Sequence, residues 1–124
     1  MPKFVVHEHY AKTHHFDLRL ERDDVLWCWA VPKGIPLEMG VRRLAIRTED
    51  HDKSALTFEG EIEEGKYGAG KIVIWDRGEF TFDSIADNKI VFRVKGEKMH
   101  GKYVLVRMPK AGEDAWLIFR GKDN

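Results

Sequence analysis

The sequence predicts an all-β protein, mainly antiparallel, that folds as a small closed β-barrel with one or two short flanking helices. Short segments rich in β-branched and aromatic residues recur along the chain, and apolar and polar residues alternate within them. Turn-forming sequences separate these segments. So many strands in 124 residues must close into a barrel or stack as a tight sandwich, because they would otherwise leave long exposed edges.

The first five strands are expected at 3–9, 14–22, 25–31, 42–48 and 56–62. In the second of them, Phe16, Leu18 and Leu20 share one parity, so one face of that strand is apolar. The sequences "RDD" and "PKGIP" follow the second and third strands, and their charged, glycine and proline residues are typical of turns.

The last five strands are expected at 70–76, 78–82, 89–95, 101–108 and 115–120. The sequences "KIVIWD", "KYVLVRM" and "AWLIFRG" show the alternation of a strand with one buried face. The turn sequences "DRGE", "ADNK" and "PKAGED" lie between these strands. Brief helical pieces are expected only around 36–40 and 83–87.

Length and composition indicate a single domain, residues 1–124, that does not enter a membrane. Hydrophobic residues make up 43% of the chain, as in ordinary globular proteins. The chain carries 21 basic and 21 acidic residues, so no overall basic field marks a nucleic-acid binder, although a few local cations suffice to bind phosphate. The single cysteine, Cys28, excludes an internal disulfide and favours a reducing compartment. We therefore expect a cytoplasmic monomer in which Cys28 is a buried structural thiol.

Four of the six histidines lie between positions 7 and 15, in "HEHYAKTHH", and they predict a metal site. On a strand, His15 and Asp17 project from one face with their backbones roughly 6.6 Å apart, so both side chains can reach one ion. His9 ends the preceding strand and supplies a third candidate ligand. Two imidazoles and one carboxylate suit Mn²⁺, Fe²⁺ or Zn²⁺ and leave positions open for substrate or water. A polar surface patch without a metal is the alternative interpretation.

Arg19 continues the face that carries Asp17. A guanidinium beside an open metal site is well matched to phosphate or carboxylate. His7 shares the parity of His9, and Glu21 shares that of Arg19, so both are candidates to orient the residues of the site.

A second enzymatic interpretation combines the pair His15 and Asp17 with a distant histidine such as His100, as in the iron site of oxoglutarate-dependent oxygenases. Those folds need several strands before the His-x-Asp pair, whereas here the pair begins at residue 15. The chain is also short for their jelly roll, which makes this the weaker enzymatic interpretation.

Several blocks of the sequence match one known family in the same order. They are "FVVHEHYAKTHHFDLRLE", "WAVPKG", "VRRLAIRTEDH", "FEGEIEEGKYGAG" and "VIWDRG". The chain resembles the 3′-phosphoesterase module of bacterial DNA ligase D and its stand-alone archaeal and bacterial relatives. The matching blocks run from residue 4 to residue 78, and the later strands match more loosely.

The resemblance implies a compact β-barrel, usually Mn²⁺-dependent, that removes a terminal ribonucleoside from a 3′ end and then removes the remaining 3′-phosphate. Zn²⁺ and Co²⁺ are alternative ions. The implied metal ligands are His9, His15 and Asp17, and the implied contacts to the scissile phosphate are Arg19, Lys33, Arg43 and His51. Only the resemblance supports Lys33, Arg43 and His51. The implied partners are DNA or RNA-tipped DNA 3′ ends, with a separate DNA ligase or polymerase as a candidate protein partner in repair.

The chain departs from the family pattern in two places. Members fused to a ligase carry an N-terminal arm before the first strand, whereas this chain starts almost at that strand. The family also has a tyrosine four residues after the "EDH" histidine, and this chain has Ala55 there, which puts efficient removal of the 3′-phosphate in doubt. The non-enzymatic alternative is a barrel that binds nucleic-acid ends and uses the metal as a structural staple.

Overall fold

Strands make up most of the regular structure in the computed structural model, which describes residues 1–66 and 68–122. The strands are β1 (Lys3–Tyr10), β2 (His15–Arg22), β3 (Val25–Val31), β4 (Arg42–Asp52), β5 (Gly60–Ile62), β6 (Gly70–Ala86), β7 (Lys89–Lys95), β8 (His100–Arg107) and β9 (Ala115–Arg120). Two short 3-10 helices, η1 (Lys53–Thr57) and η2 (Pro109–Ala111), complete the elements of the described residues. Within that part of the chain, no helix is long and apolar enough to cross a membrane.

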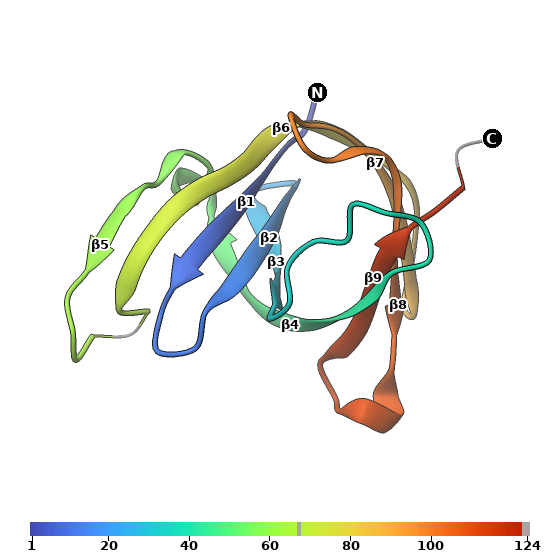
Figure 1. The fold of residues 1–124 in the computed structure, drawn as a ribbon. Helices are drawn as coiled ribbons and strands as arrows, with labels where there is room; N and C mark the ends of the chain where they lie inside the picture. The colour runs from blue at the N-terminus through green and yellow to red at the C-terminus, as the bar shows by residue number, and fades with distance from the viewer. Residues whose placement is uncertain (67, 123–124) are drawn as a thin grey trace.

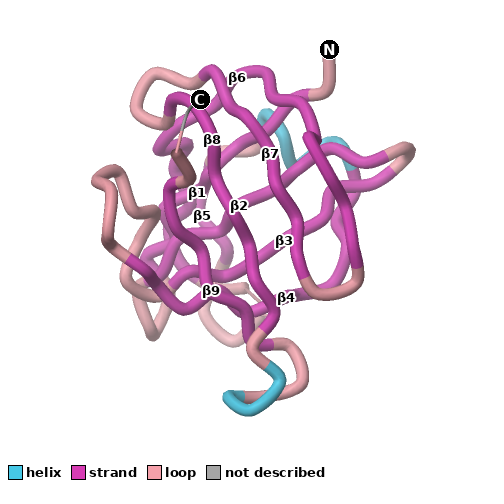
Figure 2. Tube along the Cα trace, turned by 90° about the vertical axis from the view of Figure 1, so that its right-hand side faces the viewer, coloured by secondary structure: helices cyan, strands magenta, loops and turns pink. Residues whose placement is uncertain are grey.

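Eight of the strands close into an antiparallel barrel, which Figures 1 and 2 show from two directions. Neighbours around the barrel follow the order β1-β2-β3-β4-β9-β8-β7-β6, and β6 pairs back with β1. Closure of the ring leaves the barrel strands without a free edge over most of their length. The short strand β5 pairs with the beginning of β6 outside the ring.

Strand β6 closes the barrel because it is long enough to pair with three other strands. Its first residues pair with β1 and β5, and its last residues pair with β7. Register shifts in the pairing with β1 and with β7 bend the strand around the barrel. Gly78 lies at the crossover, where a Cβ would overlap the carbonyl group of Lys95, so the backbones can approach this closely only at a glycine.

Alternation along the strands separates the core from the outer surface. Phe4 and Val6 of β1, Leu18 of β2 and Trp29 of β3 belong to the core, and each is at most 1% exposed. The opposite face of β1 and β2 carries polar side chains that are also buried, namely His7, His9, Asp17 and Arg19. Carbonyl groups between η1 and the start of β6 bond to these histidines, so this stretch of chain covers the outer face there.

The predicted all-β barrel is confirmed, whereas both predicted helical pieces are wrong. Residues 84–86 pair with 89–91 of β7, so the segment 83–87 belongs to the end of β6 and its turn. Residues 36–40 are irregular: the Tyr103 hydroxyl donates to the Pro36 carbonyl and the Arg120 guanidinium donates to the Leu37 carbonyl. In both places tertiary contacts override local propensity.

Strand boundaries differ from the prediction where distant pairing decides them. The segments 70–76 and 78–82 are parts of one continuous strand, β6, and β4 continues beyond residue 48 to Asp52. The segment 56–62 is mostly η1 and loop, and only Gly60–Ile62 pairs as a strand. The family block "FEGEIEEGKYGAG" includes Tyr67, which lies outside the described residues.

Candidate metal centre

The β1–β2 hairpin places the three predicted metal ligands side by side. His9 and His15 are cross-strand partners, and Asp17 stands opposite His7 one pair further along. The Asp17 Oδ2 atom lies 3.3 Å from His15 Nε2 and 3.7 Å from His9 Nδ1. One ligand atom from each of the three residues lies within 4.8 Å of the other two. His9, His15 and Asp17 therefore form one group that could hold a metal ion.

The orientation of both histidine rings suits a metal ligand. His9 Nε2 donates to the carbonyl group of Gly68 at 3.0 Å, and His15 Nδ1 donates to that of Thr13 at 2.9 Å. These bonds leave His9 Nδ1 and His15 Nε2 facing the Asp17 carboxylate. Backbone carbonyl groups commonly hold metal-binding histidines in this way. A largely buried set of two imidazoles and one carboxylate fits a divalent transition metal.

Neighbouring side chains shift the pKa values of Asp17 and His15. Burial raises the pKa of Asp17, but the hydrogen bond from His15 and the charge of Arg19 outweigh that effect, and the pKa of Asp17 is lowered. The hydrogen bond with Asp17 raises the pKa of His15. Asp17 is therefore a carboxylate at neutral pH, the form that binds metals, and an ion bound by this group would compete with the proton on His15.

Three side chains hold Arg19 beside the metal group. Its Nε atom donates to His7 Nδ1 at 3.1 Å, and its Nη1 atom donates to the Cys28 sulfur at 3.2 Å. Its Nη2 atom lies 3.5 Å from Asp17 Oδ2. Because Arg19 is only 7% exposed, it is a fixed guanidinium with a defined direction, which suits the recognition of phosphate oxygens.

His7 orients Arg19, in agreement with its predicted supporting role. Burial, and then the charge of Arg19, lower the pKa of His7, so its ring is neutral and its Nδ1 atom accepts the bond from Arg19. Its Nε2 atom donates to the carbonyl group of Phe58 at 2.9 Å. Glu21, the other predicted supporting residue, instead bonds to the backbone of Lys3 and pairs with Lys53, away from the metal group.

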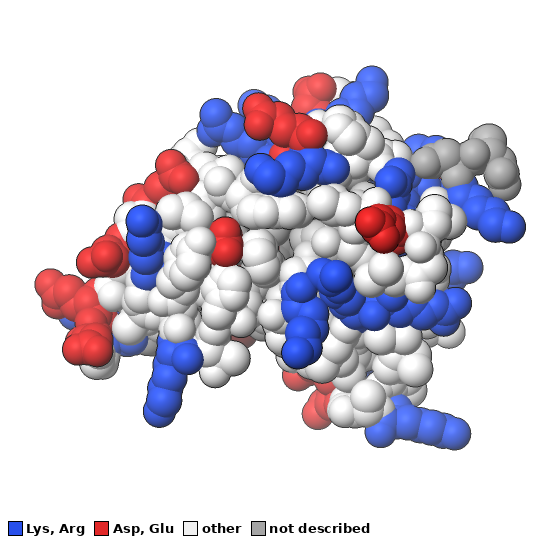
Figure 3. Space-filling model, in the orientation of Figure 1, with Lys and Arg blue, Asp and Glu red and all other residues white. Residues whose placement is uncertain are grey.

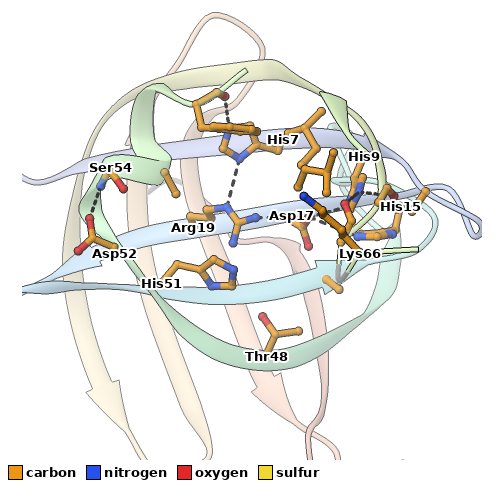
Figure 4. Close-up of a pocket in the computed structure, with 18 of the residues that line it drawn as sticks. His7, His9, His15, Asp17, Arg19, Thr48, His51, Asp52, Ser54 and Lys66 are labelled. Atoms are coloured by element: carbon orange, nitrogen blue, oxygen red, sulfur yellow. Dashed lines mark hydrogen bonds and ion pairs between the residues drawn. The ribbon is translucent and has the colours of Figure 1, made fainter. Parts of the chain in front are cut away.

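The metal group and Arg19 open into one pocket with a cavity volume of about 790 Å³, shown in Figure 4. His51 lines the pocket from β4, where its Nδ1 atom donates to the Glu49 carbonyl at 2.9 Å. Figure 4 shows His51 near Arg19, on the side of the pocket opposite His7. The structure therefore brings five predicted residues together: His9, His15, Asp17, Arg19 and His51.

Lys33 and Arg43, the two other predicted phosphate contacts, are not among the residues that line the pocket. Arg43 Nη1 donates to the carbonyl groups of Lys33, at 2.7 Å, and Gly34. Arg43 shares the parity of the core residue Ala45, so it projects to the other side of β4 from Thr48 in the pocket. Figure 3 shows basic side chains gathered near the loop before β4 and near β9, on the face seen in Figure 1.

Other residues of the pocket carry no local signal in the sequence. Thr48 reaches it because Arg19, Cys28 and Thr48 are aligned across β2, β3 and β4. Lys66 lies in the segment before β6, and Figure 4 shows it in front of the metal group. Phe58 and Ile62 enter the pocket from the chain that follows η1. Only the tertiary structure reveals these four positions.

His100, the distant histidine of the oxygenase interpretation, lies at the start of β8 and bonds to the carbonyl group of Glu97. Among the described residues, the group with metal-ligand geometry contains His9 as its second histidine. The oxygenase interpretation therefore loses the third ligand that it had assigned to His100.

The chain matches the model of the DNA Ligase D 3′-phosphoesterase domain over residues 7–107. It belongs to this family. The matched span contains the metal group, Arg19 and every predicted phosphate contact. The family membership that the sequence blocks predicted is confirmed.

Relatives in this family are much longer proteins. The chain is 44% identical over 97% of its length to the multifunctional non-homologous end joining protein LigD of Mycobacterium bovis, of which it covers 16%. Identity to the protein of the same name from Mycolicibacterium smegmatis is 43%, with 17% of that protein covered. For the Pseudomonas aeruginosa protein the values are 39% and 15%. The chain thus spans about one sixth of the length of these relatives.

Proposed function

We propose that this protein is a metal-dependent phosphoesterase that processes nucleic-acid 3′ ends in DNA repair, with Mn²⁺ as its ion. The observation that carries the proposal is the placement of a fixed guanidinium, Arg19, 3.5 Å from the carboxylate of a His-His-Asp group in one pocket. Membership of the DNA Ligase D 3′-phosphoesterase family supports the substrate class. Zn²⁺ and Co²⁺ suit the same donor set.

In this proposal the substrate phosphate lies between the metal group and Arg19. A divalent ion bound by His9, His15 and Asp17 supplies Lewis acidity toward a phosphoryl oxygen. Arg19 donates to the phosphoryl oxygens and stabilises the charge that gathers on them in the transition state. His7 keeps the Arg19 fork in this direction through the bond to Nε.

The proposed reaction removes a 3′-terminal ribonucleoside in one hydrolytic step. Water adds to the phosphorus atom and releases one proton to solvent, and the bond from phosphorus to the 5′ oxygen of the terminal ribonucleoside breaks. The upstream strand keeps a 3′-phosphate, and His51 gives a proton to the departing 5′ oxygen. The carbonyl group of Glu49 holds His51 Nδ1, which leaves Nε2 for this transfer. A second hydrolysis then converts the 3′-phosphate to a 3′-hydroxyl.

Lys33 and Arg43 contact phosphates outside the pocket in this proposal. They belong to the loop before β4 and to the start of β4, where basic side chains gather. Such contacts fix the position of a nucleic-acid strand without reading its sequence. The substrate is a DNA or RNA-tipped DNA 3′ end, and a DNA ligase or polymerase is the candidate protein partner.

A single assay tests the function. DNA labelled at its 5′ end and carrying one 3′ ribonucleotide is incubated with the protein and Mn²⁺, and the products are resolved by size and end group. We expect a 3′-phosphate product that EDTA abolishes and that Asp17→Asn does not form. Activity that persists without oxoglutarate and oxygen excludes the oxygenase. Absence of product with Mn²⁺, Zn²⁺ and Co²⁺, despite binding of the DNA end, would favour the non-enzymatic alternative.

The acid role of His51 needs its own measurement. Removal of the proton donor in His51→Gln should flatten the limb of the pH–rate profile that reports this group. A profile that is unchanged in the variant would remove His51 from this role while leaving the rest of the proposal in place.

A further inference from the structure

The pocket lining contains two chemically different groups of residues. The polar group consists of the metal group, Arg19 and His51, and the proposed reaction uses all of these residues. The apolar group, which we call the apolar wall, consists of Phe58, Ile62 and Ile72. Phosphate hydrolysis alone gives this wall no role. Phe58 is also 41% exposed, so part of this residue remains accessible to a ligand.

Hydrogen bonds and strand pairing hold the apolar wall in place. Ile62 is on β5, and its neighbour in the sheet, β6, carries Ile72. The backbone of Ile74 donates to the Glu59 carboxylate at 2.8 Å, which ties the chain after Phe58 to β6. The wall is therefore a preformed surface of the pocket.

The apolar wall is also connected to the residues that would bind the phosphate. The carbonyl group of Phe58 accepts a hydrogen bond from the His7 ring, and the His7 ring in turn accepts a hydrogen bond from Arg19. Gly68, whose carbonyl group holds His9, packs against Ile62, because a Cβ at Gly68 would lie 3.6 Å from Ile62 Cδ1. These contacts fix the position of the wall relative to Arg19 and to the metal group.

We infer that the apolar wall binds the nucleoside that leaves from the 3′ end, with the Phe58 ring packed against its base. This inference rests on the proposed function and adds the part of the substrate beyond the phosphate. A scissile phosphate at Arg19 is bonded directly to the 5′ oxygen of the leaving nucleoside, and the wall lines the same pocket as Arg19. Bases have apolar faces, and they stack on aromatic side chains irrespective of sequence. The wall thus makes a recognition site for ribonucleosides without selecting one base.

The inference predicts a difference between the two hydrolytic steps. The diester substrate carries a nucleoside that touches the wall, whereas the 3′-phosphate substrate carries none. Phe58→Ala should therefore lower kcat/KM for removal of the ribonucleoside by about 5- to 150-fold, the value of one base–aromatic contact. It should change kcat/KM for removal of a 3′-phosphate by less than about twofold. Phe58→Leu, which keeps an apolar side chain without a ring, should fall between Phe58→Ala and the wild type.

Leu44→Ala is the matched control. Leu44 is 40% exposed, close to the value for Phe58, and it lies on β4 outside the pocket lining. Its replacement removes a comparable exposed apolar side chain and should change neither step. The bond between His7 and the Phe58 carbonyl involves backbone, so the Phe58 variants keep the connection to Arg19.

A binding measurement tests the wall without turnover. Adenosine should inhibit 3′-phosphate removal and should bind the protein in an NMR titration, and both effects should weaken at least fivefold in Phe58→Ala. Equal loss of both hydrolytic steps in Phe58→Ala, or unchanged adenosine binding, would overturn the inference. If the wild type hydrolyses neither substrate, the proposed function fails, and the adenosine titration still decides whether the wall binds a nucleoside.

Discussion

Replacing Arg19 with lysine separates the charge of this side chain from its geometry. The guanidinium contacts three different side chains, and a single ammonium group cannot reproduce those directions. Lysine keeps the positive charge near Asp17 but leaves the Nδ1 atom of His7, which is only 1% exposed, without its donor. The substitution therefore tests whether direction or charge matters at this position.

The magnitude follows from burial and from the number of lost bonds. Loss of one charge-assisted hydrogen bond to a phosphoryl oxygen in a desolvated site costs about 2–4 kcal/mol of transition-state stabilisation. That cost corresponds to a roughly 30- to 1,000-fold decrease in kcat/KM. The unpaired His7 nitrogen should separately lower the free energy of unfolding by about 1–3 kcal/mol.

The assay is kcat/KM for release of the terminal ribonucleoside, measured well below the unfolding temperature of each variant. Arg22→Lys is the matched control, since Arg22 ends the same strand and lies over the ring of Trp27, away from the pocket. A decrease in activity of less than about threefold in Arg19→Lys would refute the reasoning, because exposed cations contribute at that level.

Removal of one metal ligand, in His9→Ala, His15→Ala or Asp17→Ala, should abolish Mn²⁺ binding in calorimetry and leave the barrel folded, because the core cluster does not include them. Asp76→Ala should lower the free energy of unfolding by about 3 kcal/mol, because this carboxylate accepts from the backbone of residues 77 and 97–99. In contrast, Asp83→Ala, which breaks an exposed ion pair, should cost less than about 1 kcal/mol in urea unfolding. Burial lowers the pKa of His7 in the folded protein below its ordinary value of 6.5. The associated contribution to the free energy of unfolding is fully present above pH 6.5 and is lost as the pH falls through the lowered pKa. In urea unfolding of the metal-free protein, the free energy of unfolding should therefore fall more steeply in acid for the wild type than for His7→Gln. Glutamine keeps both hydrogen bonds of His7 but has no titrating group. Ala55→Tyr should speed removal of the 3′-phosphate and not release of the ribonucleoside, because a phenolic hydroxyl adds a donor toward the more highly charged monoester.

Specific outcomes would contradict each of these expectations. Wild-type affinity for Mn²⁺ in all three ligand variants would refute the metal group. Equal costs for the Asp76 and Asp83 variants would show that the buried carboxylate is not a structural acceptor. Parallel pH dependence in the wild type and His7→Gln would remove His7 as the acid-sensitive group. A wild-type time course in which the 3′-hydroxyl product appears as fast as the 3′-phosphate forms would contradict the role given to Ala55.

The sequence predicts the metal group because the relation between its members is local. His15 and Asp17 are two residues apart on a strand, so the period of the strand alone puts them on one face. His9 is six residues from His15, and a short hairpin between two alternating segments brings it across. The direction of Arg19 follows from the same alternation. His51 is predicted only from the resemblance to the family, because the local sequence pattern around it does not indicate a role.

The tertiary structure decided the rest of the site. Lys33 and Arg43 lie outside the pocket, and Phe58, Ile62 and Lys66 lie inside it. The return of the chain through η1 and β5 brings Phe58, Ile62 and Lys66 to the pocket, and the bulge between β3 and β4 lies between the positions of Thr48 and His51, which both line it. The physical reason is that alternation specifies which face a side chain occupies within its own strand. Which residues meet across the molecule depends on the register and closure of strands that are far apart in the sequence, and those are set by packing of the whole barrel.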